Sequence, residues 1–141
     1  MSGPAPIPES DAMLTGVPEI DRQHRILVDA LIEARASLSG DAADPLFERI
    51  TRDLLAYAIY HFDAEEQAMR RHRYDADAPD AAAMHLTEHR RFSERVVALR
   101  QAARMGEPGS RAALLSFLED WLANHIKTVD KRLGQFILGK R

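Results

Sequence analysis

The stretch Y-A-I-Y-H-F-D-A-E-E-Q-A-M, from Tyr57 to Met69, has two polar side chains at positions where an amphipathic helix would bury leucine. On a helix, His61 and Glu65 lie one turn apart on the same face. These two residues belong to a stripe of mostly apolar residues along one helix face. Its members follow one another in steps of three and four residues, which is typical of a helix packed against other helices. Its members are Phe47, Ile50, Leu54, Tyr57, His61, Glu65, Ala68 and His72. Because burying such groups without partners costs on the order of several kcal/mol, we expect a partner such as a metal ion.

The composition excludes several other functions. A chain of 141 residues predicts one domain with its own core. Its 19 Lys and Arg against 22 Asp and Glu give a net charge of −3, so we expect no nucleic-acid partner. The absence of cysteine excludes disulfides, thiolate nucleophiles and sulfur-ligated metal sites. We find neither an apolar run of about 18 residues nor a signal peptide, so we expect no membrane association and a cytoplasmic protein.

Three further segments show the helical spacing of three and four residues. We predict helices from about residue 18 to 38, from 44 to 71 or 72, from 80 to 104, and from 110 onwards. Residues 73–79 are expected to be a connection. The stripes of the first, third and fourth helices are Ile20, His24, Leu27, Leu31, Ala34 and Leu38; His85, His89, Phe92, Val96, Leu99 and Ala103; and Leu114, Leu118, Trp121, His125 and Thr128. The predicted boundary signals are Ser39 and Gly40 after the first helix, and Asp44 and Ser110 as N-caps of the second and fourth.

These helices with short links predict an all-α fold, because no strand-like alternation occurs in the sequence. We expect an antiparallel up-down-up-down four-helix bundle over residues 13–141. Residues 1–12 carry three of the seven prolines and are expected to form a flexible leader. After Asp130, we expect a short C-terminal turn that packs Phe136 and Ile137 against the bundle.

Five of the six histidines interrupt the inward stripes, as does Glu65. His85 and His89 repeat the spacing of His61 and Glu65, so that both imidazoles can bind one ion. His125 and Asp130 are five residues apart, which puts them about 140° away from a common face of an α-helix. Asp130 can therefore join His125 only if the helix loosens or ends there, and Gly134 is close enough to favour this.

Together these side chains predict a metal site. A single inward histidine is usually a hydrogen-bonded core residue, but five of them with two carboxylates would be hard to bury without an ion. Five imidazoles, two bridging carboxylates and a bridging hydroxide leave one position open on a pair of octahedral ions. Nitrogen and oxygen ligands without sulfur favour iron over structural zinc.

Four motifs in this order resemble the bacterial members of the hemerythrin family, the bacteriohemerythrins. They span most of the chain and are I-D-R-Q-H at 20–24, H-F-D-A-E-E-Q-A-M at 61–69, H-L-T-E-H at 85–89 and W-L-A-N-H-I-K-T-V-D at 121–130. One departure is Asp75, because the family usually has a proline after the tyrosine matched by Tyr74. The link from Tyr74 to His85 is also longer than usual, so we expect the third helix to be entered differently.

The resemblance implies a non-haem di-iron centre with a bridging hydroxide or oxide that binds dioxygen reversibly, for storage, delivery or local sensing. A partner protein that receives or senses the oxygen would follow from such a role. The implied ligands are His85, His89 and His125 on one iron, His24 and His61 on the iron with the open position, and Glu65 and Asp130 as bridges. The oxygen pocket implied by the resemblance is formed by Leu27, Phe62, Trp121, Leu122 and Ile126. These five residues also fit ordinary core packing.

Two other functions remain open. A di-iron enzyme acting on peroxide or nitric oxide would use the same ligands but would need a polar proton donor beside the open iron. No pocket candidate offers one, so we expect a binding protein and no enzyme. A zinc peptidase is the other alternative, because H-L-T-E-H also fits a metalloprotease pattern with Glu88 as the base. That pattern leaves His24, His61, Glu65 and Asp130 unexplained. We read Glu66 and Glu88 as solvent-facing groups or groups behind the ligands, and His72 as too distant to bind.

Overall fold

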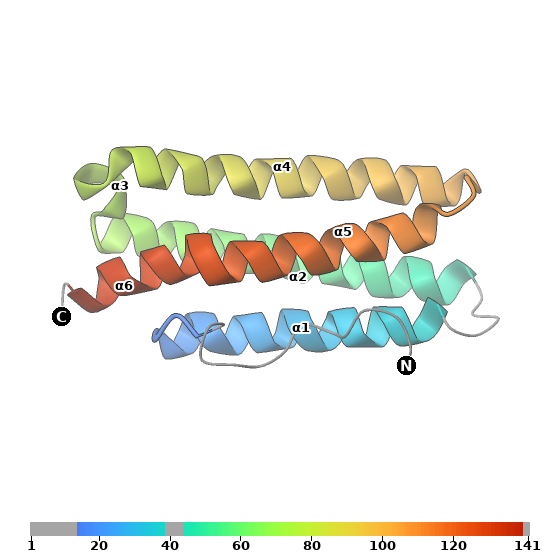
Figure 1. Cartoon of the computed structure of the whole chain (residues 1–141), viewed down its shortest axis with the longest axis horizontal. Coiled ribbons are helices and arrows are strands. Elements are labelled where there is room, and N and C mark those ends of the chain that lie inside the picture. The colour runs from blue at the N-terminus through green and yellow to red at the C-terminus, as the bar shows by residue number, and fades with distance from the viewer. Residues whose placement is uncertain (1–13, 39–43, 140–141) are drawn as a thin grey trace.

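The chain folds as an all-α helical bundle. The computed structural model describes residues 14–38 and 44–139, and within these ranges every regular element is helical. Its long helices are α1 (Pro18–Leu38), α2 (Asp44–Arg71), α4 (Pro79–Arg104) and α5 (Ser110–Asn124), which lie side by side in Figure 1. None of the described helices is long and apolar enough to cross a membrane. The predicted leader and the predicted stop at Ser39 and Gly40 lie outside the described residues, as does the side chain of Asp44.

The start of α1 agrees with its prediction and has a clear physical cause. Pro18 occupies the first turn, where a missing backbone N–H costs nothing. The Asp21 carboxylate accepts hydrogen bonds from the backbone N–H and the hydroxyl of Thr15, both at 2.8 Å, and from the N–H of Gly16 at 3.2 Å. These bonds tie the chain before the helix to its first turn, and so set the direction in which α1 enters the bundle.

The connection predicted at residues 73–79 contains a short helix, α3 (Tyr74–Asp77). Arg73 precedes it with a left-handed backbone (φ 64°), and the N–H of Asp77 donates to the carbonyl of Arg73. The Tyr74 side chain is buried and packs edge-on against Phe136, with ring centroids 4.9 Å apart. This packing accounts for the longer link: the extra residues form a helical turn that carries Tyr74 into the core before α4 begins.

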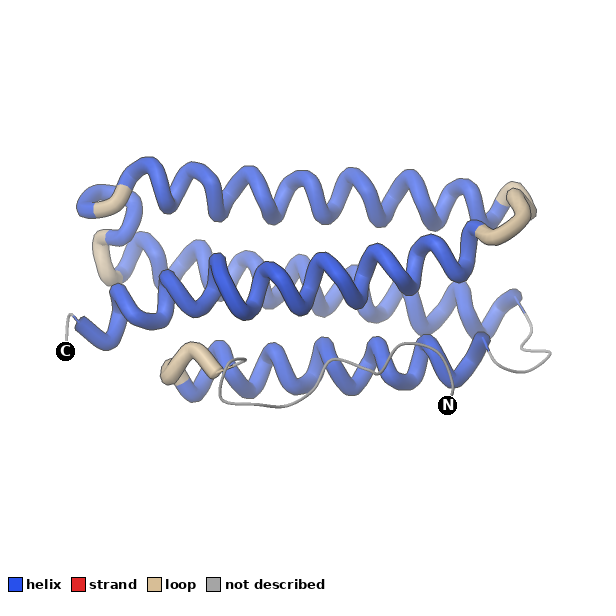
Figure 2. Tube along the Cα trace, viewed as in Figure 1, coloured by secondary structure: helices blue, strands red, loops and turns tan. Residues whose placement is uncertain are grey.

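The fourth helical segment is longer than predicted. After α5, the chain continues through the π-helix η2 (His125–Asp130) into α6 (Lys131–Gly139), and Figure 2 shows no loop between them. The predicted C-terminal turn is therefore wrong, although Ile137 is buried and Phe136 packs against the core as expected. Ser110 is also no N-cap: Gly109 holds that position, and the Ser110 hydroxyl donates to the carbonyl of Glu107 at 2.7 Å.

Buried side chains form two apolar clusters with a polar layer between them. The larger cluster includes Leu27, Phe62, Phe92, Leu118 and Ile126. The smaller cluster contains Val17, Ile20, Ala68, Met69, Tyr74, Ala81, Ala82, Leu133 and Ile137. The polar residues of the inward stripes lie between these two sets along α1, α2 and α4, and the polar residues of η2 join the same layer. The bundle therefore surrounds a buried polar layer in the middle of an otherwise hydrophobic interior.

Candidate metal centre

Seven side chains from all parts of the bundle meet in this polar layer, and each is at most 5% exposed. They are His24 from α1, His61 and Glu65 from α2, His85 and His89 from α4, and His125 and Asp130 from η2. All seven were singled out from the sequence, and the structure brings all of them together. His72 belongs to neither of the ligand groups formed by these residues.

The seven side chains form two overlapping groups in which the possible ligand atoms all lie within 4.8 Å of one another. One group contains Glu65, His85, His89, His125 and Asp130. The other contains His24, His61, Glu65 and Asp130. Glu65 and Asp130 belong to both, so the arrangement can hold two neighbouring cations with a carboxylate shared between them.

Asp130 has the geometry of a bridging ligand. Its Oδ2 atom lies 2.7 Å from Nε2 of His24, while its Oδ1 atom lies 3.0 Å from Nε2 of His85 and 2.9 Å from Nε2 of His125. Each carboxylate oxygen therefore faces a different group of imidazoles. Glu65 is placed less symmetrically: its Oε1 atom lies 3.1 Å from Nε2 of His89 and 3.5 Å from that of His61.

The π-helix η2 is what allows Asp130 to reach the centre. In an α-helix, residues five apart point about 140° away from each other. A π-turn closes through i→i+5 hydrogen bonds and is wider, so it can bring such residues to one side. Here the N–H of Lys131 donates to the carbonyl of Ile126, and both His125 and Asp130 are buried. The predicted loosening of the helix is thus confirmed, and Gly134 is not its cause, because that residue lies within α6.

The same wide turn overturns one sequence prediction. Thr128 was assigned to the inward stripe by α-helical spacing, but its side chain is exposed. The buried neighbours in η2 are His125, Ile126, Val129 and Asp130. The π-turn contains one more residue than an α-turn, so a different set of positions faces the interior. The buried stripe therefore continues from His125 to Val129 and Asp130 and leaves Thr128 outside.

The donor atoms fit a bound cation. Five of them are buried and have no hydrogen-bond partner among the described residues: Nε2 of His61, His85 and His125, Oε2 of Glu65 and Oδ1 of Asp130. Leaving such an atom unsatisfied costs about 1–3 kcal/mol, so an additional bound partner would stabilise the group. Metal ions satisfy this requirement because they take the lone pairs of neutral imidazoles and ionised carboxylates.

The pKa shifts of the buried side chains also support a bound cation. Burial, with the neighbouring imidazoles of His85 and His125, lowers the pKa of His89 to about 2, so this ring stays neutral. Burial opposes the charged form of Asp130, but the surrounding histidines, His125 foremost, hold its pKa well below the usual range. Burial, and then the negative charge of Asp130, raise the pKa of Glu65 well above its usual range. A cation between these carboxylates would offset both the burial and the repulsion from Asp130 that raise the pKa of Glu65.

Three of the imidazoles are oriented by a polar side chain behind them. The Nδ1 atom of His61 lies 2.6 Å from the side-chain oxygen of Gln23, that of His89 lies 2.9 Å from Glu66, and that of His125 lies 3.0 Å from Glu88. With the proton on Nδ1, each ring presents Nε2 to the centre. Glu66 and Glu88 thus lie behind the ligands, which confirms one of the two predicted roles. Gln23 was missed, and its only signal was its position next to His24.

The five predicted pocket residues are buried or half-buried. Four of them, Leu27, Phe62, Trp121 and Leu122, line a small cavity of about 10 Å³, which is about the volume that one water-sized molecule needs. The remaining lining residues are Leu31, Leu54, Ala58, Phe92 and Leu118. Ile126 is fully buried in the same cluster but does not line the cavity. Phe62 stacks on His89 and Trp121 stacks on His125, with ring centroids 4.0 and 4.3 Å apart, so the cavity adjoins the centre.

Comparison with known proteins agrees with this geometry. The family model described as the Hemerythrin HHE cation binding domain matches residues 15–137, which include all seven polar side chains. The bacteriohemerythrin of Methylococcus capsulatus (strain Bath) is 28% identical over 120 residues, covering 85% of this chain and 87% of that protein. No solved structure gives a significant match. Because the family match covers nearly the whole chain, this protein belongs to the hemerythrin family.

Proposed function

We propose that the chain binds dioxygen reversibly at a centre of two non-haem iron ions. The observation that carries this proposal is the pair of overlapping, buried ligand groups that share Glu65 and Asp130. In this assignment, one iron is held by three imidazoles and the other by two. The ligands are His85, His89 and His125 for the first iron and His24 and His61 for the second, with a hydroxide or oxide as a further bridge.

The ligand chemistry supports iron in this role. Among the described residues, the ligand groups offer nitrogen and oxygen donors, and helical bundles are a known scaffold for carboxylate-bridged iron pairs. Two ferrous ions, when bound, supply the electrons and the open position that dioxygen binding requires. The protein keeps the His89 imidazole neutral and orients the rings of His61, His89 and His125. It needs no side chain that acts as an acid or base.

The apolar cavity beside the centre supports reversible binding. All nine residues that line it are aliphatic or aromatic. Such a lining excludes water and offers no carboxylate or imidazole as a proton donor, which slows conversion of bound dioxygen into other products. We assign the ligand pocket to Leu27, Phe62, Trp121 and Leu122, with Ile126 packed behind them.

The proposal also includes the helix order, the extent of the bundle and the use of the bound oxygen. The order of the helices is proposed to be up-down-up-down, because short links join them and Figure 1 has the α2–α4 link and the α4–α5 link at opposite ends. The bundle is proposed to span residues 13–141. Storage, delivery or local sensing of oxygen are the proposed uses, and a partner protein that receives or senses the oxygen is still only a prediction.

The test is an absorption spectrum of the iron-loaded, anaerobically reduced protein. We expect a visible band to appear on exposure to air and to disappear under argon over repeated cycles. Iron analysis should give about two ions per chain. Irreversible oxidation within seconds of mixing, or one zinc ion per chain in the purified protein, would overturn the proposal.

Turnover assays with hydrogen peroxide and with nitric oxide address the enzymatic alternative. We expect no sustained turnover, because the cavity lining has no carboxylate, imidazole or hydroxyl group that could act as a proton donor. The peptidase alternative has little support, since Glu88 accepts a hydrogen bond from His125 and is thus engaged behind a ligand. Sustained consumption of peroxide or nitric oxide would assign the centre to catalysis instead.

A further inference from the structure

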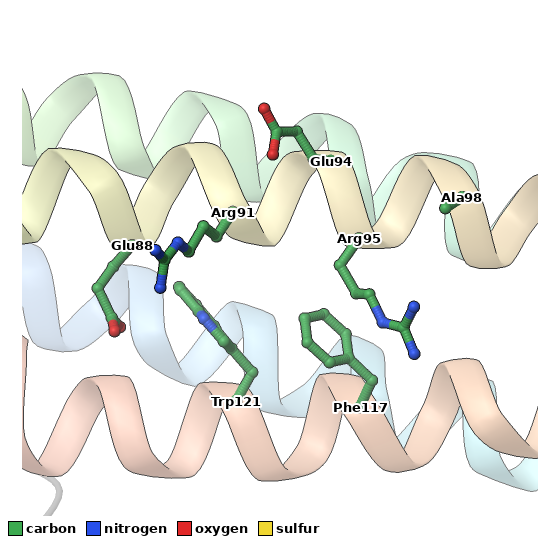
Figure 3. A pocket seen from close by; sticks show the side chains of 7 residues that line it. All are labelled: Glu88, Arg91, Glu94, Arg95, Ala98, Phe117 and Trp121. Carbon is green, nitrogen blue, oxygen red and sulfur yellow. The ribbon is translucent and has the colours of Figure 1, made fainter.

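A second cavity lies on the surface between α4 and α5 and shares Trp121 with the apolar cavity beside the metal centre. It is a groove of ≈ 520 Å³, within the range of about 300–1,000 Å³ typical of small-molecule sites. Figure 3 shows its lining: Glu88, Arg91, Glu94, Arg95, Ala98, Phe117 and Trp121. The groove combines an aromatic floor with charged walls.

The aromatic floor comes from α5. Phe117 and Trp121 project from α5 toward α4 in Figure 3, and both are half-buried. Behind them, Phe92 packs against both rings, with centroids 6.1 Å from Phe117 and 4.5 Å from Trp121. Because this packing holds the two rings in place, they offer a rigid apolar surface against which a flat ring can lie.

The positive wall comes from α4. Arg91 and Arg95 are four residues apart, one helical turn, and both side chains extend toward α5 in Figure 3. Their guanidinium groups lie at opposite ends of the groove, that of Arg91 near Glu88 and that of Arg95 beyond Phe117. Neither arginine forms an ion pair or a side-chain hydrogen bond in the part of the chain that the structure describes. By contrast, Arg35 pairs with Glu119, and Arg100 and Arg104 share Glu48. The two groove arginines are thus available to an anion, and guanidinium groups favour planar carboxylates.

Of the two acidic residues of the groove, only Glu88 restricts the charge of the ligand. Glu94 points away from the two aromatic rings in Figure 3. Glu88 lies at the other end of the groove, where its carboxylate accepts a hydrogen bond from Nδ1 of His125 at 3.0 Å. A second negative charge on a ligand would be repelled there. The lining therefore suits a flat ring that carries a single carboxylate.

We propose that this groove binds a planar aromatic monocarboxylate, with its ring against Phe117 and Trp121 and its carboxylate on Arg95, away from Glu88. Bound ligand acts on the metal centre by two contacts: the hydrogen bond between Glu88 and His125, and the stacking of Trp121 on His125, whose ring planes differ by only 13°. The binding site does not depend on the proposed oxygen chemistry, whereas the effect on the centre rests on it.

Calorimetric titration of the iron-loaded full chain tests the binding site, with 1-naphthoate as the probe and uncharged 1-naphthamide as its matched ligand. We expect naphthoate to bind about tenfold more tightly than the amide. Arg95→Gln should weaken naphthoate binding about tenfold, and Arg91→Gln should weaken it less, because the Arg91 guanidinium lies at the other end of the groove. Arg90→Gln is the control, because it removes the same charge from the next residue, which does not line the groove. Equal affinities for acid and amide, or an equal loss in the control, would overturn the site.

Visible absorption of the oxidised, iron-loaded protein tests the effect on the centre. Saturation with naphthoate should shift the iron spectrum, and Glu88→Gln should reduce that shift while calorimetry still detects binding. Binding without any spectral change would overturn the coupling. The two proposals can be tested separately. If the protein binds naphthoate but is not reversibly oxygenated, the oxygen function is wrong. If it is reversibly oxygenated but does not bind naphthoate, the groove is not a ligand site.

Discussion

The Nε2 atom of His24 lies 2.7 Å from a carboxylate oxygen of Asp130, although 106 residues separate them along the chain. His24 comes from the first long helix and Asp130 from the π-helix after α5, so this contact joins the first and last helical segments. The other oxygen of Asp130 faces His85 and His125. One carboxylate therefore connects the two groups of imidazoles, and much of the centre depends on it.

Replacing this carboxylate tests its bridging role. Asp130→Asn keeps the size of the side chain but removes its charge, so we expect bound iron to fall from about two ions per chain to about one. Iron analysis after loading and desalting measures this. Asp120→Asn is the control, because Asp120 is exposed on α5. Full retention of both irons in the Asp130 variant would show that Asp130 is no bridge.

The carboxylate behind His89 should contribute to metal affinity. Glu66→Gln retains an acceptor for the His89 Nδ1–H but removes the negative charge that makes the imidazole a stronger donor. We expect iron affinity to fall about 10- to 100-fold, measured by competition with a chelator. Glu33→Gln, at an exposed position of α1, should leave the affinity unchanged. The same affinity for both variants would mean that Glu66 only occupies space.

Gly134 is required by a close contact and not by helix termination. A Cβ atom at this position would lie 2.6 Å from the backbone oxygen of Thr15 and 2.7 Å from its Cβ. Gly134→Ala should therefore lower the free energy of unfolding by about 1–3 kcal/mol, measured by urea denaturation. Gly139→Ala, also in α6, meets nothing within 4 Å and serves as the control. Equal stability of the two variants would contradict the contact.

The Glu48 ion pairs predict a dependence of stability on pH. The pKa of Glu48 is lowered, first by the hydrogen bond from Arg104 and then by the positive charges of Arg100 and Arg104. Partial burial opposes this shift but is outweighed. A carboxylate with a lowered folded-state pKa stabilises the protein above its unfolded-state pKa of 4.5, and this contribution is lost as the pH falls through the folded-state value.

Comparison with Glu48→Gln isolates this contribution, because both proteins keep the same metal centre. The difference between their free energies of unfolding should be largest near neutral pH and should shrink as the pH is lowered below 4.5. Denaturant titrations across this range measure it. The carboxylate is partly exposed, so salt should also reduce the difference. A difference that stays constant with pH would exclude the ion pairs as its cause.

The helices and the members of the centre could be predicted from the sequence because both depend on local spacing. Stripes of apolar residues every three or four positions mark the buried face of a helix whatever it packs against. A histidine or glutamate within such a stripe is therefore directed inward. This reasoning identified His24, His61, His85, His89 and His125 without any knowledge of how the helices pair.

The features that could not be predicted from the sequence depend on contacts between segments that are distant along the chain. Gln23 has no periodic signal of its own, and only the approach of α1 to α2 makes it the partner of His61. The terminal helix α6 is stabilised by packing Leu133 and Ile137 into the smaller cluster, which no local propensity reports. The groove beside Trp121 likewise exists only because α4 and α5 lie next to each other.

The sequence by itself determined that four amphipathic helices would direct five imidazoles and Glu65 into one interior, because side-chain direction follows from helical periodicity. Only the tertiary structure decided how Asp130 joins them. Its position requires a π-turn, and the wider turn is favourable because it places a carboxylate among buried histidines on other helices. α-Helical spacing predicted that Thr128 would face inward, because nothing in the local sequence indicates that the helix widens into a π-turn.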